Sequence, residues 1–172
     1  MNLETLELTA FHEAAHAVLA IRSSYHIVSG DLTISADGAG EAPIGASEQK
    51  LVAAGKPTDP ALLLADPDYI RELVRILFAG ILAEKIRAQE VSADRVLRPN
   101  LKVSGAPDIK YAQKVMHDAV LDFQAEKDEL KKQSEGLVHQ EWQLISTLAD
   151  MMLFDPSVPL SRELARFAAT KR

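Results

Sequence analysis

The stretch from residue 3 to residue 24 contains neither proline nor glycine, and apolar side chains recur in it at helical spacing. It therefore predicts a long first helix over residues 3–23. Inside this helix lies the sequence His-Glu-Ala-Ala-His, residues 12–16. Histidines four positions apart lie one turn above each other on the same helix face, so both imidazoles can reach a single metal ion.

The glutamate that follows the first histidine, Glu13, is rotated around the helix by roughly a quarter turn. This takes its carboxylate away from the ligands and beside the coordination position that a catalytic zinc keeps open for water. The pattern predicts a catalytic zinc centre with His12 and His16 as ligands and Glu13 as the base. A surface helix that carries two unrelated histidines and a solvated glutamate is the alternative interpretation of the same residues.

The composition of the 172-residue chain limits its ligands and partners. It has no cysteine, which excludes disulfides and thiolate metal sites, so any metal must use His, Asp and Glu side chains. A formal charge of -6 disfavours nucleic acid as a partner. We find no signal-peptide pattern and no apolar run of the ~18 residues that a membrane span needs. We expect one domain over residues 1–172 of a soluble, cytoplasmic protein, without nucleic acid or membrane partners.

Periodicity in the rest of the chain predicts a mainly α fold with one small β element, an edge strand or hairpin, beside the metal site. The β element is expected over residues 25–36, where Leu32, Thr33 and Ile34 alternate as a strand does. Residues 37–66 and 88–107 are expected to be largely irregular, because glycine and proline interrupt them. Helices are expected over residues 3–23, around 47–54, and over 67–89, 108–123, 127–153 and 161–167.

Several of these features have more than one interpretation. The β element either pairs with an extended peptide or only covers the first helix, and residues 37–66 form either a substrate lid or a tolerated insertion. Asp108 begins a predicted helix, where an aspartate is most often a cap. Glu84, a lone carboxylate on an apolar helix, is either a surface charge or the partner that orients a ligating histidine.

Three blocks, in this order along the chain, resemble the peptidase domain of the FtsH family of ATP-dependent zinc metalloproteases. They are residues 11–19 (FHEAAHAVL), 79–86 (AGILAEKI) and 104–112 (SGAPDIKYA). They are similar to that family's HEAGHA segment, its GGR-x-AEE block and its T/S-GA-x-x-D-aliphatic-x-x-A block. The predicted strand at residues 25–36 also lies where the family has its substrate-binding edge strand.

The resemblance implies a helical zinc-peptidase domain and assigns roles to five residues. His12, His16 and Asp108 would hold Zn2+. Glu13 would be the catalytic general base, and Glu84 would orient a ligand from outside the metal's own shell. The implied activity is that of a hydrolase, a metalloprotease that cleaves peptide bonds in peptides or unfolded protein segments. That substrate is the implied partner, with a separate ATPase or a homo-oligomer as further candidates.

The chain departs from the family pattern at several positions. Ala15 and Ala79 replace glycines. Ile81 replaces an arginine, and Lys85 replaces a glutamate. No G-x-x-x-x-G-K-[ST] loop is present, so we expect no ATP-driven unfolding by this chain. Two other classes stay open: a non-proteolytic zinc-containing peptide-binding or regulatory protein on the same fold, and a zinc hydrolase of another bond. Glu13 favours an enzyme, because a structural zinc needs no base.

Overall fold

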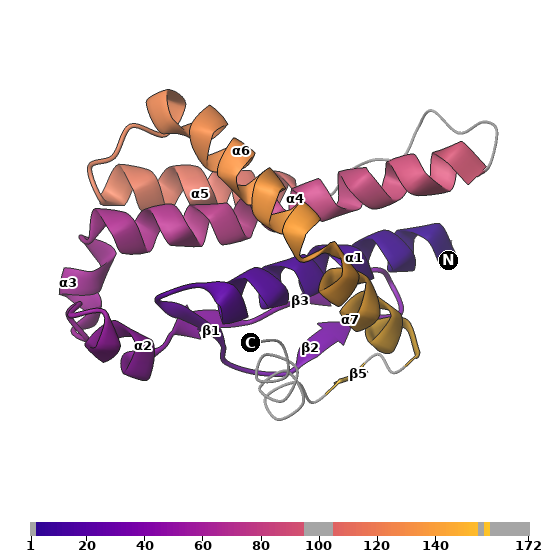
Figure 1. Ribbon diagram of the computed structural model, residues 1–172, viewed down its shortest axis with the longest axis horizontal. Helices are drawn as coiled ribbons and strands as arrows, with labels where there is room; N and C mark the ends of the chain where they lie inside the picture. Colours follow the sequence, from indigo (N-terminus) through magenta and orange to yellow (C-terminus); the bar gives the residue numbers. More distant parts are fainter. Residues whose placement is uncertain (1–2, 95–104, 155–156, 159–172) are drawn as a thin grey trace.

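The structure is a computed structural model that describes residues 3–94, 105–154 and 157–158 (Figure 1). The helices in this part of the chain are α1 (Leu3–Arg22), α2 (Glu48–Ala53), α3 (Pro60–Leu64), α4 (Pro67–Asp94), α5 (Ala106–Asp118), α6 (Phe123–Gln140) and α7 (Trp142–Phe154). The strands are β1 (His26–Val28), β2 (Leu32–Ile34), β3 (Gly40–Glu41), β4 (Ile44–Ala46) and β5 (Ser157–Val158). The predicted mainly helical fold is confirmed.

The first helix, α1, is the central element of the core and packs against α4 and α7 (Figure 1). Its predicted range is confirmed to within one residue. Alanines at positions 10, 14, 15, 17 and 20 are fully buried. Such small side chains let neighbouring helices approach closely, and Phe11, Val18 and Leu19 fill the space between them. Because α1 is covered along most of its length, the His-Glu-Ala-Ala-His motif lies in the interior.

The longest helix, α4, begins where the sequence predicts. Asp66 accepts hydrogen bonds from the backbone N–H groups of Asp68 and Tyr69, both at 3.0 Å, which is a side-chain N-cap. The helix continues to Asp94, beyond the predicted end at residue 89. It packs against α1, α5 and α6. This position lets α4 present side chains to both elements that carry candidate metal ligands.

A side chain from α2 fixes the C-terminal end of α1. The Lys50 ammonium donates to four backbone carbonyl oxygens, at 3.2, 2.9, 2.9 and 2.6 Å, which belong to Ala20, Ile21, Ser23 and His26. The last carbonyls of a helix have no partner within it, and a cation there is also favoured by the helix dipole. The helix around residues 47–54, predicted from the sequence, therefore anchors the histidine-bearing helix.

The β element expected over residues 25–36 is confirmed by β1 and β2, but the expectation that it is the only one was wrong. β1 pairs with β4, whereas β2 lies between β3 and β5, and all of these pairs are antiparallel. β3, β4 and the short helix α3 lie in the stretch that was expected to be irregular. β3 has only two residues and Gly45 is the middle residue of β4, so neither carries the run of β-branched or aromatic side chains that predicts a strand. Their pairing depends on contacts across the fold.

Two predicted helix boundaries in the second half of the chain were also wrong. The helix expected over residues 108–123 ends at Asp118, and Phe123 instead begins α6 behind an Asp122 cap. Val120, which lies within that expected range, is 93% exposed and has φ 58°. The backbone N–H of Leu121 donates to Met116 O at 2.8 Å, which closes the helix end in the manner of a Schellman motif.

The helix expected over residues 127–153 is divided at Glu141 into α6 and α7. α6 packs mainly on α4, whereas α7 packs on α1, and the two helices run in different directions (Figure 1). The Glu141 carboxylate lies 3.0 Å from Arg22 Nε at the end of α1. This ion pair holds the break against the first helix. The short helix expected over residues 161–167 lies outside the described residues.

No helix in the described ranges is long and apolar enough to cross a lipid bilayer.

Candidate metal centre

Helices α1 and α5 bring three candidate ligand atoms together. His12 Nε2 lies 2.8 Å from His16 Nε2 and 2.9 Å from Asp108 Oδ2, and the distance from His16 Nε2 to the same carboxylate oxygen is 3.7 Å. Among the described residues, these three form the group of His, Asp and Glu side chains able to share one metal ion. The histidines are 6% exposed, and the side chain of Asp108 is 22% exposed. The centre is therefore reached from the Asp108 side.

Helix α4 orients both imidazoles through their other ring nitrogens. His16 Nδ1 lies 2.8 Å from the backbone carbonyl oxygen of Ile76, so this nitrogen carries the proton and donates it. His12 Nδ1 lies 2.7 Å from Glu84 Oε1. With Nδ1 held in this way, Nε2 of each histidine is left to bind a metal. Glu84 is 1% exposed, so it is not a surface charge.

Gly80, on the turn of α4 between these two supports, leaves the room that the ligand atoms occupy. A Cβ at this position would lie 2.6 Å from His16 Nε2 and 2.7 Å from His12 Nε2. Real Cβ atoms essentially never approach other atoms closer than 3.0 Å. The backbone of α4 therefore forms one wall of the candidate metal centre, and only glycine fits there.

Asp108 lies in the first turn of α5, but it is not the helix cap that its position suggested. Gly105 is the N-cap residue, and no side chain caps this end. A Cβ at Gly105 would lie 2.0 Å from Ile81 Cγ1, so the missing side chain allows α5 to begin directly against α4. The Asp108 carboxylate is then free to turn toward His12 and His16.

The charges around the centre favour a positive charge between the ligand atoms. Burial opposes the charge of His12, yet contacts with Asp108 and Glu84 and the nearby Glu13 raise its pKa to about 10. Burial alone would raise the pKa of Asp108, but its contacts with His12 and His16 hold that pKa well below its usual range. A site that stabilises a cation so strongly is suited to a divalent metal ion.

The donor set fits zinc on geometry as well. Two ligand atoms of tetrahedral zinc, with bonds of ~2.0–2.1 Å, are separated by roughly 3.3 Å. The three observed separations of 2.8, 2.9 and 3.7 Å bracket that value. Two imidazole nitrogens and one carboxylate oxygen form a ligand set that catalytic zinc accepts while keeping a position open. His12, His16 and Asp108 are thus the residues that would hold the metal.

Glu13 is beside these ligands but not among them. It is 8% exposed, and the backbone of β3 passes close to it, since a Cβ at Gly40 would lie 2.8 Å from Glu13 Oε1. Burial raises the pKa of Glu13, nearby Asp108 and Glu84 add to this, and His16 and His12 oppose it. A raised pKa brings this carboxylate nearer to the range in which it can both accept and release a proton.

All five residues singled out from the sequence lie at this centre. The structure adds the carbonyl of Ile76 and the contact between β3 and Glu13, which sequence reasoning missed. A backbone carbonyl carries no residue signature, so nothing in the sequence could have pointed to Ile76. Gly80 belongs to the sequence block at residues 79–86, but sequence reasoning did not show that it borders the ligand atoms.

The chain matches no model of a known protein family, and a search of curated proteins finds no significant match. The resemblance to the FtsH peptidase domain therefore stays a prediction that rests on the three sequence blocks.

Proposed function

We propose that this chain is a zinc-dependent metallopeptidase, similar to the peptidase domain of the FtsH family, that hydrolyses peptide bonds in peptides or unfolded protein segments. The observation that carries the proposal is the convergence of His12, His16 and Asp108 on one point, with Glu13 beside it. A purely structural zinc would fill its fourth position with protein and would need no base. The retained carboxylate favours hydrolysis.

Zinc bound at this centre would supply Lewis acidity, which polarises a carbonyl and lowers the pKa of water. The chain's own residues handle positions and protons. Glu84 and the Ile76 carbonyl hold the two imidazoles in the tautomer that directs Nε2 inward. Glu13 accepts the proton of the attacking water and then passes it to the leaving amine.

Strand β3 supports an extended peptide as the substrate. It lies at the edge of the β3-β2-β5 sheet, and among the described strands only β2 pairs with it. Gly40 and Glu41 are both exposed, and Gly40 lies against Glu13. A substrate that added itself to this edge through main-chain hydrogen bonds would run past the base. This assigns to β3 the substrate-binding role first expected for residues 25–36.

A second candidate is a non-proteolytic, zinc-containing peptide-binding or regulatory protein. The limited exposure of His12, Glu13 and His16, between 6% and 8%, favours it, because a metal held so deeply is hard for a substrate carbonyl to reach. The two candidates differ in whether Glu13 has a chemical task.

Cleavage of a labelled unfolded protein by the zinc-loaded chain tests the choice, with a Glu13→Gln variant as its matched control. The amide keeps the size of the side chain and spares the three candidate ligands while it removes the base. We expect cleavage by the wild type alone, with equal zinc content in both proteins. If neither protein cleaves while both hold zinc, the metallopeptidase proposal fails for this chain acting alone and the binding protein is favoured.

A further inference from the structure

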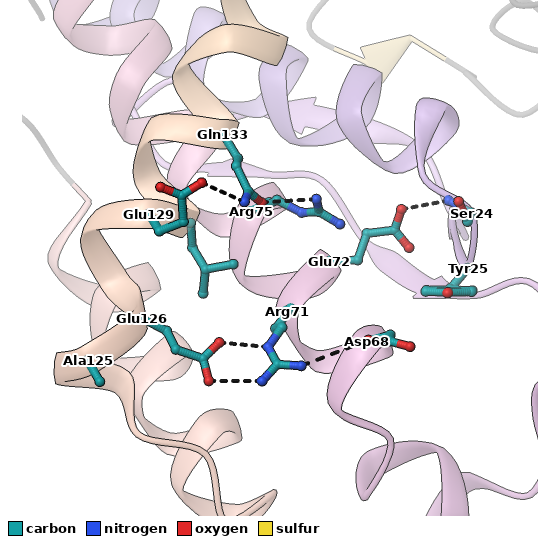
Figure 2. A pocket seen from close by; sticks show the side chains of 11 residues that line it. Ser24, Tyr25, Asp68, Arg71, Glu72, Arg75, Ala125, Glu126, Glu129 and Gln133 are labelled. Carbon is teal, nitrogen blue, oxygen red and sulfur yellow. Dashed lines mark hydrogen bonds and ion pairs between the residues drawn. The ribbon is translucent and has the colours of Figure 1, made fainter.

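A cavity of about 540 Å³ lies between α4, α6 and the segment that joins α1 to β1 (Figure 2). The charged side chains that line it have partners within the protein. Arg71 donates to both carboxylate oxygens of Glu126, at 2.6 and 3.0 Å. Glu72 accepts from the backbone N–H of Ser24 at 2.7 Å, and its other oxygen lies 4.0 Å from His26 Nδ1. None of the lining residues belongs to the candidate metal centre. Another part of the fold must therefore position a substrate of that centre.

Strand β3 lies against the face of α1 that carries Glu13 (Figure 1). Thr9 and Glu13 are four positions apart, so their side chains share this face. A Cβ at Gly40 would lie 2.6 Å from Thr9 Cγ2 and 2.6 Å from Glu13 Cγ. Because Gly40 has no side chain, the backbone of β3 can touch both residues. The proposed base and the strand proposed to hold the substrate are thus in direct contact.

A hydrogen bond from Thr9 ties the β2–β3 hairpin (residues 32–41) to this face of α1. Thr9 is 9% exposed, and its Oγ1 donates to the backbone carbonyl oxygen of Gly38 at 2.9 Å. In the part of the chain that the structure describes, no other hydrogen bond joins α1 to residues 35–41. Apolar contacts are non-directional, whereas a hydrogen bond restricts both distance and angle. The Thr9 hydroxyl therefore sets how the hairpin sits on α1.

The turn that contains Gly38 is braced by its own hydrogen bonds. The backbone N–H of Gly38 donates to Ser35 O at 2.9 Å, and the backbone N–H of Ser35 donates to Ala39 O at 2.7 Å. Gly38 itself has φ +88°, a conformation that glycine adopts without strain. A braced turn moves as a unit, so a bond that holds Gly38 also holds Gly40, two residues further along the chain.

We propose that Thr9 is a positioning residue of the metallopeptidase. Through the Gly38 carbonyl it holds β3 against Glu13, and so it aligns a peptide paired with β3 relative to the base. This inference rests on the proposed function. A misplacement of ~1 Å in a reacting geometry can cost roughly a hundredfold in rate. Thr9 is not a candidate metal ligand, so its loss should disturb the peptide's alignment and leave zinc binding unchanged.

Two hydroxamates separate peptide alignment from metal binding in calorimetric titrations of the zinc-loaded chain. Acetohydroxamate can bind the metal but is too small to pair with a strand, whereas acetylated tetra-alanine hydroxamate can do both. The tetra-alanine compound should bind the wild type more than about tenfold tighter than acetohydroxamate, because it adds main-chain hydrogen bonds. Thr9→Val keeps the shape of the side chain and removes the hydroxyl. It should reduce that ratio to about threefold or less and leave acetohydroxamate binding unchanged.

Three further variants test whether the hydroxyl is the cause. Thr9→Ser keeps the hydroxyl and should keep the wild-type ratio. Thr147→Val is the matched control, because Thr147 Oγ1 also donates to a backbone carbonyl, that of Gln143 at 2.8 Å, but within α7. It should not change the ratio. Gly40→Ala inserts a Cβ between β3 and α1, so it should lower the ratio as Thr9→Val does.

Cleavage of a labelled unfolded protein should follow the same order. Thr9→Val should lower kcat/KM by at least about tenfold, with Thr9→Ser and Thr147→Val close to the wild type. A wild type that cleaves, together with an undiminished ratio in Thr9→Val or an equal loss in Thr9→Ser, would overturn the role of Thr9 and leave the metallopeptidase standing. If the wild type neither cleaves nor prefers the tetra-alanine compound, the proposed function fails and the role of Thr9 fails with it.

Discussion

Replacing Gly80 by alanine should abolish tight zinc binding while the protein stays folded. A Cβ at this position would lie 2.6 Å from His16 Nε2 and 2.7 Å from His12 Nε2, whereas ordinary contacts begin at 3.4 Å. The alanine Cβ would thus be too close by about 0.8 Å to His16 Nε2 and by about 0.7 Å to His12 Nε2. A zinc site tolerates changes of only ~0.2 Å in its metal–ligand distances. Both nitrogens would have to leave their positions, so zinc affinity should fall by at least about a hundredfold.

The effect of this substitution on folding is much smaller. Alanine gains about 1 kcal/mol over glycine in a helix interior, and the extra methyl group in a packed site costs about 1–3 kcal/mol. The metal-free variant should therefore lose no more than about 2 kcal/mol in its free energy of unfolding. Loss of zinc can then be measured on a folded protein.

Gly136→Ala is the matched control, because it makes the same change in the middle of α6. A Cβ there meets no atom within 4 Å. This variant should gain about 1 kcal/mol in stability and keep the zinc affinity of the wild type. Competition with a chromophoric chelator gives the affinities, and urea denaturation in excess chelator gives the stabilities. If Gly80→Ala binds zinc as tightly as Gly136→Ala, the ligand atoms do not converge against α4.

Three further predictions concern the third ligand, a helix end and a buried histidine. Asp108→Ala should lower zinc affinity by more than about a hundredfold, and Glu84→Gln should lower it by about 10–100-fold. Unchanged zinc content in the Asp108 variant would show that the third ligand is another residue. Val120→Gly should raise the free energy of unfolding by about 1 kcal/mol in urea denaturation, because it relieves a left-handed backbone under an exposed side chain. Val120→Ala keeps the Cβ and should show no such gain, so equal stability of the two variants would argue against backbone strain. Burial, with the positive charges of Lys50 and Arg75, lowers the pKa of His26 from its ordinary value of 6.5 to about 4. The unfolded chain therefore takes up a proton first as pH falls below 6.5, and His26 should cost the fold about 2 kcal/mol of stability by pH 5. His26→Phe should lack this part of the acid dependence, and parallel stability curves for the two proteins between pH 6.5 and 4 would refute it.

The residues of α1 and α4 could be placed from the sequence because their signals are local. Helical periodicity and the Asp66 cap depend on neighbours within one or two turns, so both starts were predicted to within a residue. The same reasoning failed at Glu141 and Val120. A continuous apolar pattern does not show that α6 packs on α4 while α7 turns back onto α1. Nor does it show that a valine adopts the backbone conformation usually left to glycine.

The candidate site likewise combines residues placed by local helix spacing with residues placed by contacts between distant parts of the chain. Sequence spacing alone determined that His12 and His16 share one helix face with Glu13 beside them, because three residues within five positions of one helix have fixed relative directions. Only the tertiary structure decided that Asp108 turns inward instead of capping α5, that Glu84 is buried against His12, and that the Ile76 carbonyl and Gly80 face His16. These contacts join positions far apart in the chain. The distances between the contacting atoms depend on how closely the alanine-rich face of α1 lets α4 and α5 approach.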